Sequence, residues 1–443
     1  MQHLDHGAVL SEIATLCKSG TRKLVRNALT KAPYDKAATN WDVTRQIEHR
    51  FSCVLPDKLT ATNQHRSGRC WIFAGLNTLR IYLMRKYDLE DFEFSQSYLF
   101  YFDKLEKANY FLEKIIETAS EDNDSRIVSH LVSSPMQDGG QWDMFASLVL
   151  KYGLVPKSVY PDSEASLSSP DMNYALTLRL RAAAAEIRRQ LREKARPDVI
   201  QTLKRGILSE IQKILFVHMG EPPQAFDWTY YDKKQKQHTH KNLDPLRFYR
   251  DFLKIDISRF VCLVHSPRQK TPYNEMYTID YLGNVIEGQK IRYLNVPIEQ
   301  LKSVATLSLL KHDPVWFGCD VKKQFHRELG VMEMDLFPYN MLYDGDFSIS
   351  KEERMLYGES QMTHAMVFTG VHLNQDKPAR WRVENSWGDK VGDKGFFIMG
   401  DSWFDEYMFE VVVNQEYIPS KFKKLLTKPV RHLPPWDPLG ALA

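Results

Sequence analysis

"ATNQHRSGRCWIFAGLN", residues 61–77, places a cysteine where a helix is expected to begin. Ser67 and Gly68 interrupt regular structure just before Cys70, and apolar residues then recur every three or four positions in "CWIFAGLNTLRIYLMRKYDL", residues 70–89. A helix amino terminus stabilises a thiolate, because its free N–H groups and dipole favour negative charge. Cys70 is therefore either a nucleophile or a small apolar side chain in a core, since free cysteine often packs as a hydrophobe.

Two residues far along the chain have the chemistry to activate such a cysteine. His364 lies in "MTHAMVFTGV" at the start of an expected strand, and Asn385 follows 21 residues later in "VENSWG". An imidazole can take the thiol proton, and an asparagine carbonyl can accept the ring N–H without competing for that proton. Each has a structural alternative, a core histidine for His364 and an Asx turn for Asn385.

Attack on an amide also creates an oxyanion, which needs hydrogen-bond donors already in place. Gln64, six residues before Cys70, is suited to supply a side-chain amide for this purpose. Gly139 and Gly140 precede another predicted helix that ends near Gly153, and paired glycines indicate a tight turn or a close approach of backbone.

The order of these motifs resembles the papain-like cysteine peptidases, through Gln64, "SGRCW" (67–71), "THAM" (363–366) and "ENSWG" (384–388). The resemblance implies that Cys70 is the nucleophile and that His364 is the general base and acid. It implies that Asn385 orients the histidine and that Gln64 is the oxyanion donor.

Other residues gain roles from the same resemblance. Trp387 is expected to shield the bond between His364 and Asn385 from water, and Gly139 and Gly140 to bind the substrate backbone. Arg69 replaces a residue of the usual motif beside the nucleophile. We interpret it as part of a structural ion pair and assign it no catalytic role.

Further segments resemble the bleomycin hydrolase branch of that family, whose members are cytosolic aminopeptidases. The chain departs from the cathepsin type because His364 follows Cys70 by 294 residues rather than about 130–150, which implies an insertion of about 150 residues. The segments that carry the likeness are "FEFSQSYLF" (92–100), "DGGQWDM" (138–144), "KYGLVPK" (151–157), "VWFGCDV" (315–321), "GESQMTHAM" (358–366) and "WDPLGALA" (436–443).

The branch resemblance has consequences for substrate and assembly. It implies a carboxyl-terminal arm in the cleft, with the carboxylate of Ala443 pairing with the free amino group of a substrate. It implies short peptides and amide-bearing compounds such as bleomycin as substrates, and a homohexamer as the assembly.

The expected fold is α+β, a papain-like two-lobed peptidase with a helical lobe, a β-barrel-like lobe, a large helical insertion and a carboxyl-terminal arm. Short apolar runs separated by Gly, Asn and Asp predict strands after about residue 301. The predicted divisions are an amino-terminal extension (1–60), the helical lobe (61–165), an inserted helical and basic region (166–300), the β-rich lobe (301–420) and the arm (421–443).

Composition restricts the classes of function. The 443 residues carry a formal charge of +3, and their five cysteines are thinly spread without a Cys-x-x-Cys pair. We therefore expect free thiols in a reducing, cytoplasmic setting, with no metal, no cofactor and no membrane span. A cysteine aminopeptidase is the main interpretation, and a papain-like endopeptidase is one alternative.

A basic oligomeric nucleic-acid-binding protein with a secondary peptidase site is the other alternative. Residues 174–215 carry ten Lys or Arg against four Asp or Glu, an excess of six positive charges. The segment 232–241, read as a polar loop, adds to that excess. Solvated helix faces and a loop are the favoured explanation of this charge, because no recognised nucleic-acid-binding motif accompanies it.

Overall fold

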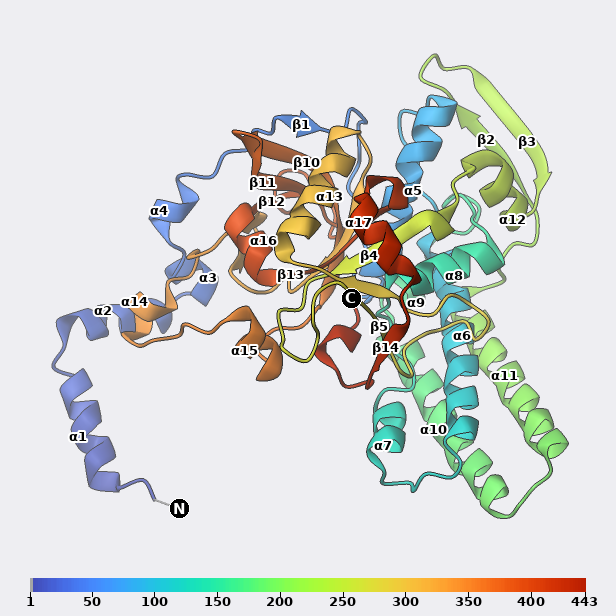
Figure 1. Cartoon of the computed structure of the whole chain (residues 1–443), viewed down its shortest axis with the longest axis horizontal. Coiled ribbons are helices and arrows are strands. Elements are labelled where there is room, and N and C mark those ends of the chain that lie inside the picture. Colours follow the sequence, from blue (N-terminus) through green and yellow to red (C-terminus); the bar gives the residue numbers. More distant parts are fainter. Residues whose placement is uncertain (1–2) are drawn as a thin grey trace.

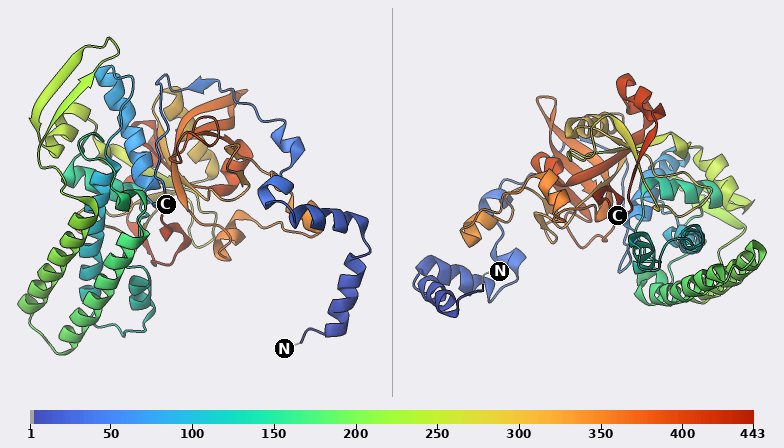
Figure 2. Two further views of the ribbon diagram at one scale, coloured as in Figure 1. Left: turned by 180° about the vertical axis from the view of Figure 1, so that it is seen from behind. Right: turned by 60° about the horizontal axis from the view of Figure 1, so that its bottom comes forward.

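The computed structural model describes residues 3–443 and has two main parts, one helical and one built on a large sheet (Figure 1). Each part has its own hydrophobic core. The carboxyl-terminal end lies between them, in the middle of the molecule in both Figure 1 and Figure 2. A chain end buried between two parts is well placed to influence a cleft there.

The helical part is built around α5 (Cys70–Tyr87), which is buried along most of its length. The sequence predicts its first residue correctly. The prediction of Ser95 as an N-cap is also confirmed, because its hydroxyl accepts the Tyr98 N–H at 3.1 Å. The other helices of this part are α6 (Gln96–Glu117), α7 (Arg126–Ser133), α8 (Trp142–Tyr152), α9 (Glu164–Leu167), α10 (Pro170–Arg192) and α11 (Pro197–Met219).

The helices α10 and α11 form a long antiparallel pair that projects away from the sheet (Figure 1). Pro197 stands at the first position of α11, where a missing N–H is tolerated, so it divides the two helices as the sequence predicts. The basic residues of this segment sit mostly on exposed faces of the pair.

The sheet has the order β14-β5-β6-β4-β13-β7-β10-β11-β12-β9-β8, and β1 also pairs with β10. Its strands are β1 (Cys53–Val54), β4 (Phe260–Val264), β5 (Glu275–Ile279), β6 (Tyr293–Asn295), β7 (Val315–Cys319), β8 (Phe325–His326), β9 (Val331–Met332), β10 (His364–Asn374), β11 (Lys377–Glu384), β12 (Phe396–Gly400), β13 (Met408–Asn414) and β14 (Val430–Leu433). The helices α13 (Ile298–Leu310) and α16 (Asp401–Tyr407) pack against it. Alternating buried residues of the central strands face α5 on one side and the second core on the other.

Two segments differ from the sequence prediction. The region 166–300 is helical only in part, because β4, β5 and β6 belong to the large sheet. The predicted polar loop at 232–241 is a loop only over 232–236, where it connects β2 (Phe226–Tyr231) to β3 (Gln237–Leu243); residues 237–241 belong to β3 of this hairpin. Cross-strand pairs stabilise this polar hairpin, including a hydrogen bond between the hydroxyls of Thr229 and Thr239 at 3.1 Å.

The amino-terminal helices extend from the sheet side of the molecule (Figure 2). The first, α1 (His6–Leu16), has no buried residue among those that the structure describes, 3–443. It is followed by α2 (Gly20–Leu29), α3 (Tyr34–Ala37) and α4 (Trp41–Thr44). The remaining short helices are α12 (Pro245–Arg247), α14 (Tyr339–Tyr343), α15 (Lys351–Leu356) and α17 (Ser420–Lys423). Within residues 3–443, none of the helices combines the length and the apolar character needed to cross a bilayer.

Candidate active site

Cys70 is the first residue of α5 and is almost completely buried, with 2% of its surface exposed. Burial raises the pKa of its thiol to about 11, while hydrogen bonds from the backbone N–H groups of Ala365 and Trp71 act in the opposite direction. The resting side chain is therefore a neutral thiol. The amides that surround its sulfur are in position to stabilise a thiolate once the proton leaves.

His364 lies beside this thiol, because Ala365, the next residue along β10, donates its backbone N–H to the cysteine. The Nε2 atom of His364 lies 2.8 Å from Oδ1 of Asn385, which fixes that nitrogen as the donor. The Asn385 oxygen also accepts the backbone N–H of Ser386 at 2.7 Å, so the asparagine is itself held in place. The arrangement leaves Nδ1 of the imidazole free to accept a proton.

The imidazole is kept neutral by its surroundings. Burial lowers the pKa of His364 to about 4, although the Asn385 hydrogen bond opposes that effect. Trp387 packs against the ring, with the two ring centroids 4.9 Å apart, and Phe397 packs in turn against the tryptophan. A neutral, shielded imidazole is a general base, because it has an unoccupied nitrogen lone pair.

Gln64 connects the nucleophile loop with the segment that carries Asn385. Its side-chain oxygen accepts the hydroxyl of Ser386 at 2.6 Å, and its side-chain nitrogen donates to the Ser67 carbonyl at 2.6 Å. A primary amide carries two N–H groups, so one donor of Gln64 remains for an oxyanion. Ser386 was not singled out from the sequence, and its position next to Asn385 is the signal that identifies it.

Arg69 forms the structural ion pair that the sequence interpretation assigns to it. Its fully buried guanidinium donates to Asp162 at 2.9 Å and to the Ser67 hydroxyl at 2.9 Å. The rings of Phe73 and Phe100 lie 5.1 and 5.3 Å from its central carbon. These contacts fix the loop directly before Cys70, so Arg69 supports the start of α5 from inside the core.

Asp138 joins that loop to the glycine pair, a role that the sequence did not indicate. Its carboxylate accepts the Gly68 N–H at 2.9 Å and the Lys104 ammonium at 2.6 Å. Its backbone carbonyl accepts the Trp71 indole N–H at 2.7 Å. Burial alone would raise the pKa of Asp138, but Lys104 and the hydroxyl of Ser169 hold it well below its usual range. The carboxylate therefore stays charged and ties the two loops together.

The glycine pair holds the carboxyl-terminal arm. Gly140 donates its N–H to the Ala443 oxygen at 3.2 Å and accepts the Ala443 N–H at 3.3 Å, so the two segments pair as antiparallel strands do. The side chain of Gln141 donates to the carbonyl of Ala441 at 2.8 Å. A Cβ atom on Gly139 would lie 2.7 Å from the Ala443 oxygen, which explains why glycine stands there.

Gly140 has a different neighbour. A Cβ atom at this position would lie 2.5 Å from the indole of Trp71, the residue that follows the nucleophile. Gly140 therefore connects the end of the arm with the helix that begins at Cys70, because it contacts both Ala443 and Trp71. The structure brings together every residue that the sequence suggested for the site, and the arm occupies the backbone hydrogen bonds expected for a substrate.

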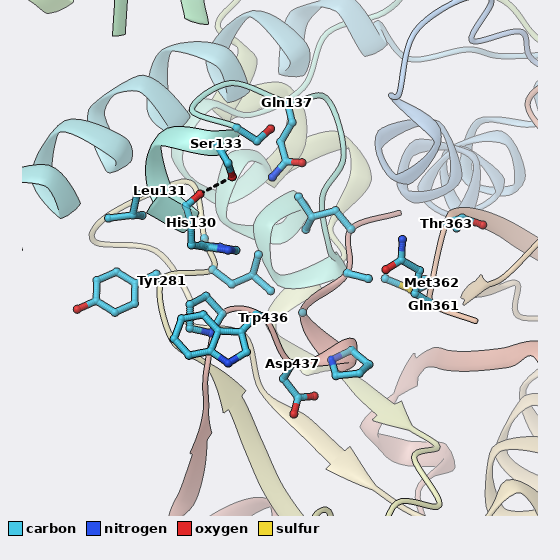
Figure 3. Close-up of a pocket in the computed structure, with 18 of the residues that line it drawn as sticks. His130, Leu131, Ser133, Gln137, Tyr281, Gln361, Met362, Thr363, Trp436 and Asp437 are labelled. Carbon is cyan, nitrogen blue, oxygen red and sulfur yellow. Dashed lines mark hydrogen bonds between the residues drawn. The ribbon is translucent and has the colours of Figure 1, made fainter. Parts of the chain in front are cut away.

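A cavity of about 840 Å³ continues the site along the other side of the arm (Figure 3). Its wall includes Gln361, Met362 and Thr363, which lead directly into His364, and Trp436 and Asp437 of the arm. Figure 3 shows Trp436 and Asp437 projecting beside this space, opposite the segment that contains His130 and Gln137.

Known proteins are similar to this chain in sequence and in fold. The chain matches the Peptidase C1-like family over residues 8–440. It is 43% identical to the aminopeptidase C of Listeria monocytogenes over 423 residues, which covers 95% of each chain, and 40% identical to the bleomycin hydrolase of Rattus norvegicus over 405 residues, which covers 89% of each. The crystal structure of PepW from Lactobacillus rhamnosis superposes with a TM-score of 0.97 at 39% identity, covering 100% of this chain and 99% of that one. These similarities confirm the predicted papain-like fold, and the chain belongs to the peptidase C1-like family.

Proposed function

We propose that the chain is a thiol-dependent aminopeptidase that removes amino-terminal residues from short peptides through a covalent intermediate on Cys70. Relatives named aminopeptidase C and bleomycin hydrolase, each about 40% identical over most of the chain, support the class of enzyme. The observation that carries the proposal is the pairing of Ala443 with Gly140, since it closes one side of the cleft next to the nucleophile.

The first half of the reaction forms a thioester. Nδ1 of His364 takes the thiol proton while the sulfur attacks the carbonyl carbon of the scissile amide. The oxyanion accepts hydrogen bonds from the backbone N–H of Cys70 and from the free side-chain N–H of Gln64. His364 then gives its proton to the leaving amine, and the carbon–nitrogen bond breaks.

The second half releases the product. His364 takes a proton from a water molecule, the hydroxide attacks the thioester carbon, and the carbon–sulfur bond breaks as the thiolate regains the proton from the imidazolium. Asn385 keeps the ring aligned in both halves, because its oxygen holds Nε2–H at 2.8 Å throughout. Trp387 keeps bulk water away from that bond.

The arm accounts for the choice of substrate. An extended peptide bound along Gly140 would need the two hydrogen bonds that Ala443 already makes. The amino terminus of the substrate therefore lies where the peptide meets Ala443. A carboxylate on Ala443 would pair with the free α-amino group of the first substrate residue. Gly139 and Gly140 then position the arm, and through it the substrate.

We extend the proposal to the range of substrates, the compartment and the assembly. The substrates include amide-bearing compounds such as bleomycin, since a relative bears that name. The compartment is the cytosol, which keeps the five free thiols reduced. A homohexamer is the proposed assembly, supported by the exposed apolar residues of α1, and light scattering on the purified protein would test its mass. The basic helices stay a predicted site for nucleic acid, to be tested by binding at physiological salt.

A pair of substrates tests the central proposal. Under reducing conditions, a fluorogenic aminoacyl amide should be cleaved, its N-acetylated twin should be cleaved far more slowly, and Cys70→Ser should cleave neither. Equal cleavage of the two substrates would retain the cysteine chemistry but refute the arm as a gate and favour an endopeptidase. Activity that survives in Cys70→Ser would refute the assigned nucleophile.

A further inference from the structure

We infer that Arg268 and Asp437 form an anchor that sets how far the carboxyl-terminal arm reaches into the cleft. Both are positioning residues, because neither touches the nucleophile and each acts through the arm. The inference rests on the proposed function in so far as the arm selects substrates with free amino groups.

The two side chains form a buried, two-pronged ion pair. Arg268 Nη2 lies 2.6 Å from Asp437 Oδ1, and Arg268 Nη1 lies 3.1 Å from Asp437 Oδ2. Each side chain is only 3% exposed. A planar guanidinium that meets a carboxylate at both oxygens fixes orientation as well as distance, which a single contact does not.

Arg268 is held by a rigid polar socket. Its Nε atom donates to the hydroxyl of Ser266 at 3.0 Å, and that hydroxyl lies 2.8 Å from the hydroxyl of Thr271. Asn295 closes the socket, since it accepts the N–H of Ser266 at 2.8 Å and donates to the carbonyls of Ser266 and Thr271. All of these residues are buried. The loop after β4 therefore presents the guanidinium in one fixed position.

Asp437 uses the same carboxylate to shape the arm. Its Oδ1 atom accepts the N–H of Leu439 at 3.0 Å, and its backbone carbonyl accepts the N–H of Gly440 at 2.7 Å. The resulting turn leads directly into residues 441–443, whose far end is fixed by Gln141 and Gly140. Both ends of a six-residue segment are thus held, so its reach is defined.

One face of the arm segment is not packed against other residues but borders a cavity. Pro435 to Asp437, Pro438 and Gly440 to Leu442 line the cavity of about 840 Å³, so that face of the arm lacks close neighbours (Figure 3). Trp436 is partly exposed there and is covered by the Arg126 guanidinium, 3.8 Å from the ring centroid. Apolar burial on one face does not fix the position of the arm along the cleft, whereas the ion pair between Arg268 and Asp437 does.

The test combines substrate choice with hydrogen exchange in the full-length protein. Asp437→Asn removes the charge and keeps the shape, and Arg268→Lys keeps the charge but loses the second prong. Lys302→Gln is the control, because Lys302 is also a buried cation but is paired with Asp401 and Asp405, which do not belong to the arm. For each protein, kcat/KM is measured on the free-amine substrate and its N-acetylated twin, and exchange of the amides at 438–443 is followed by mass spectrometry.

Loosening the arm should affect both measurements in Asp437→Asn. We expect the ratio of kcat/KM values to fall about tenfold, with N-acetylated substrate cleaved faster than by wild type, and the arm amides to exchange about tenfold faster. Arg268→Lys should show smaller shifts in the same directions, and it provides the comparison if Asp437→Asn does not fold. Lys302→Gln should show neither shift.

Three results would overturn the inference. They are an unchanged ratio and unchanged exchange in folded anchor variants, a proportional loss on both substrates, or equal shifts in the Lys302→Gln control. Hydrogen exchange does not depend on catalysis. If wild type cleaves neither substrate, the proposed function fails, and faster exchange confined to the arm of the anchor variants still supports the anchor.

Discussion

A Cβ atom added at Gly139 would meet the arm and one added at Gly140 would meet Trp71, so replacing each glycine by alanine should give different results. In Gly140→Ala the added methyl would lie 2.5–2.7 Å from three atoms of the Trp71 indole. Carbon atoms in contact are normally about 3.5–4.0 Å apart, so roughly 1 Å of separation is missing. Trp71 is fully buried and its N–H is bonded to Asp138, so it has no room to withdraw.

Gly140→Ala should therefore reduce the free energy of unfolding by about 1–3 kcal/mol, the usual effect of overpacking a core. In Gly139→Ala the methyl instead meets the arm, 2.7 Å from the Ala443 oxygen and 2.8 Å from the Leu442 Cβ. Leu442 is only partly buried against the first core, so the end of the arm has more room to shift than the indole of Trp71. The free energy of unfolding should then fall less than in Gly140→Ala, while the preference for free-amine over N-acetylated substrate falls.

Urea denaturation and the two-substrate assay measure these effects side by side. Equal destabilisation by both alanines would refute the prediction that the added methyl meets the arm at position 139 and the core at position 140. A Gly139→Ala protein that keeps the full preference for free amines would show that the arm contact at this glycine does not control substrate choice.

Three other predictions concern the catalytic pair and its support. Asn385→Ala should lower kcat by about 10²–10³-fold, with little change in the urea midpoint, because the ring of His364 loses its 2.8 Å partner; a wild-type kcat would exclude an orienting role. The plot of kcat/KM against pH should fall on the acid side near pH 4, since burial lowers the pKa of His364 to about 4 in the substrate-free protein and the protonated ring cannot accept the thiol proton; a fall near pH 6.5 would contradict a buried neutral base. The lowered pKa of Asp138 stabilises the fold above the ordinary aspartate pKa of about 3.9, and this stability is lost as pH falls below that value; Asp138→Asn should therefore unfold more easily at pH 7 and differ less from wild type at pH 3.

Local signals in the sequence predict the elements that carry the site. Cys70 opens its helix and His364 opens its strand, because breakers and apolar periodicity mark both boundaries within a few residues. The segment 260–295 was assigned to a helical insertion and contains strands instead. Short apolar runs such as "FVCLV" do not by themselves distinguish a buried strand from a helix segment.

The sequence does not predict which distant residues form the supporting ion pairs. Asp162, the partner of Arg69, is 93 residues away, and Arg268 is 169 residues from Asp437. No periodicity or local motif links such positions, since only the folded sheet brings the loops together. The candidate site residues can be proposed from the sequence because several motifs occur in a fixed order, whereas the supporting ion pairs carry no such signal.

The candidate site is assembled from segments that are far apart in the sequence. Gln64 meets Ser386 across 322 positions, and Gly140 meets Ala443 across 303 (443 minus 140). During synthesis, a growing chain presents the cysteine long before it presents the histidine and asparagine. An unfinished chain that stops before His364 therefore has the Cys70 thiol without the imidazole proposed to activate it. On the proposed mechanism, the thiol gains peptidase activity only after Asn385 has been added and β10 has joined the sheet.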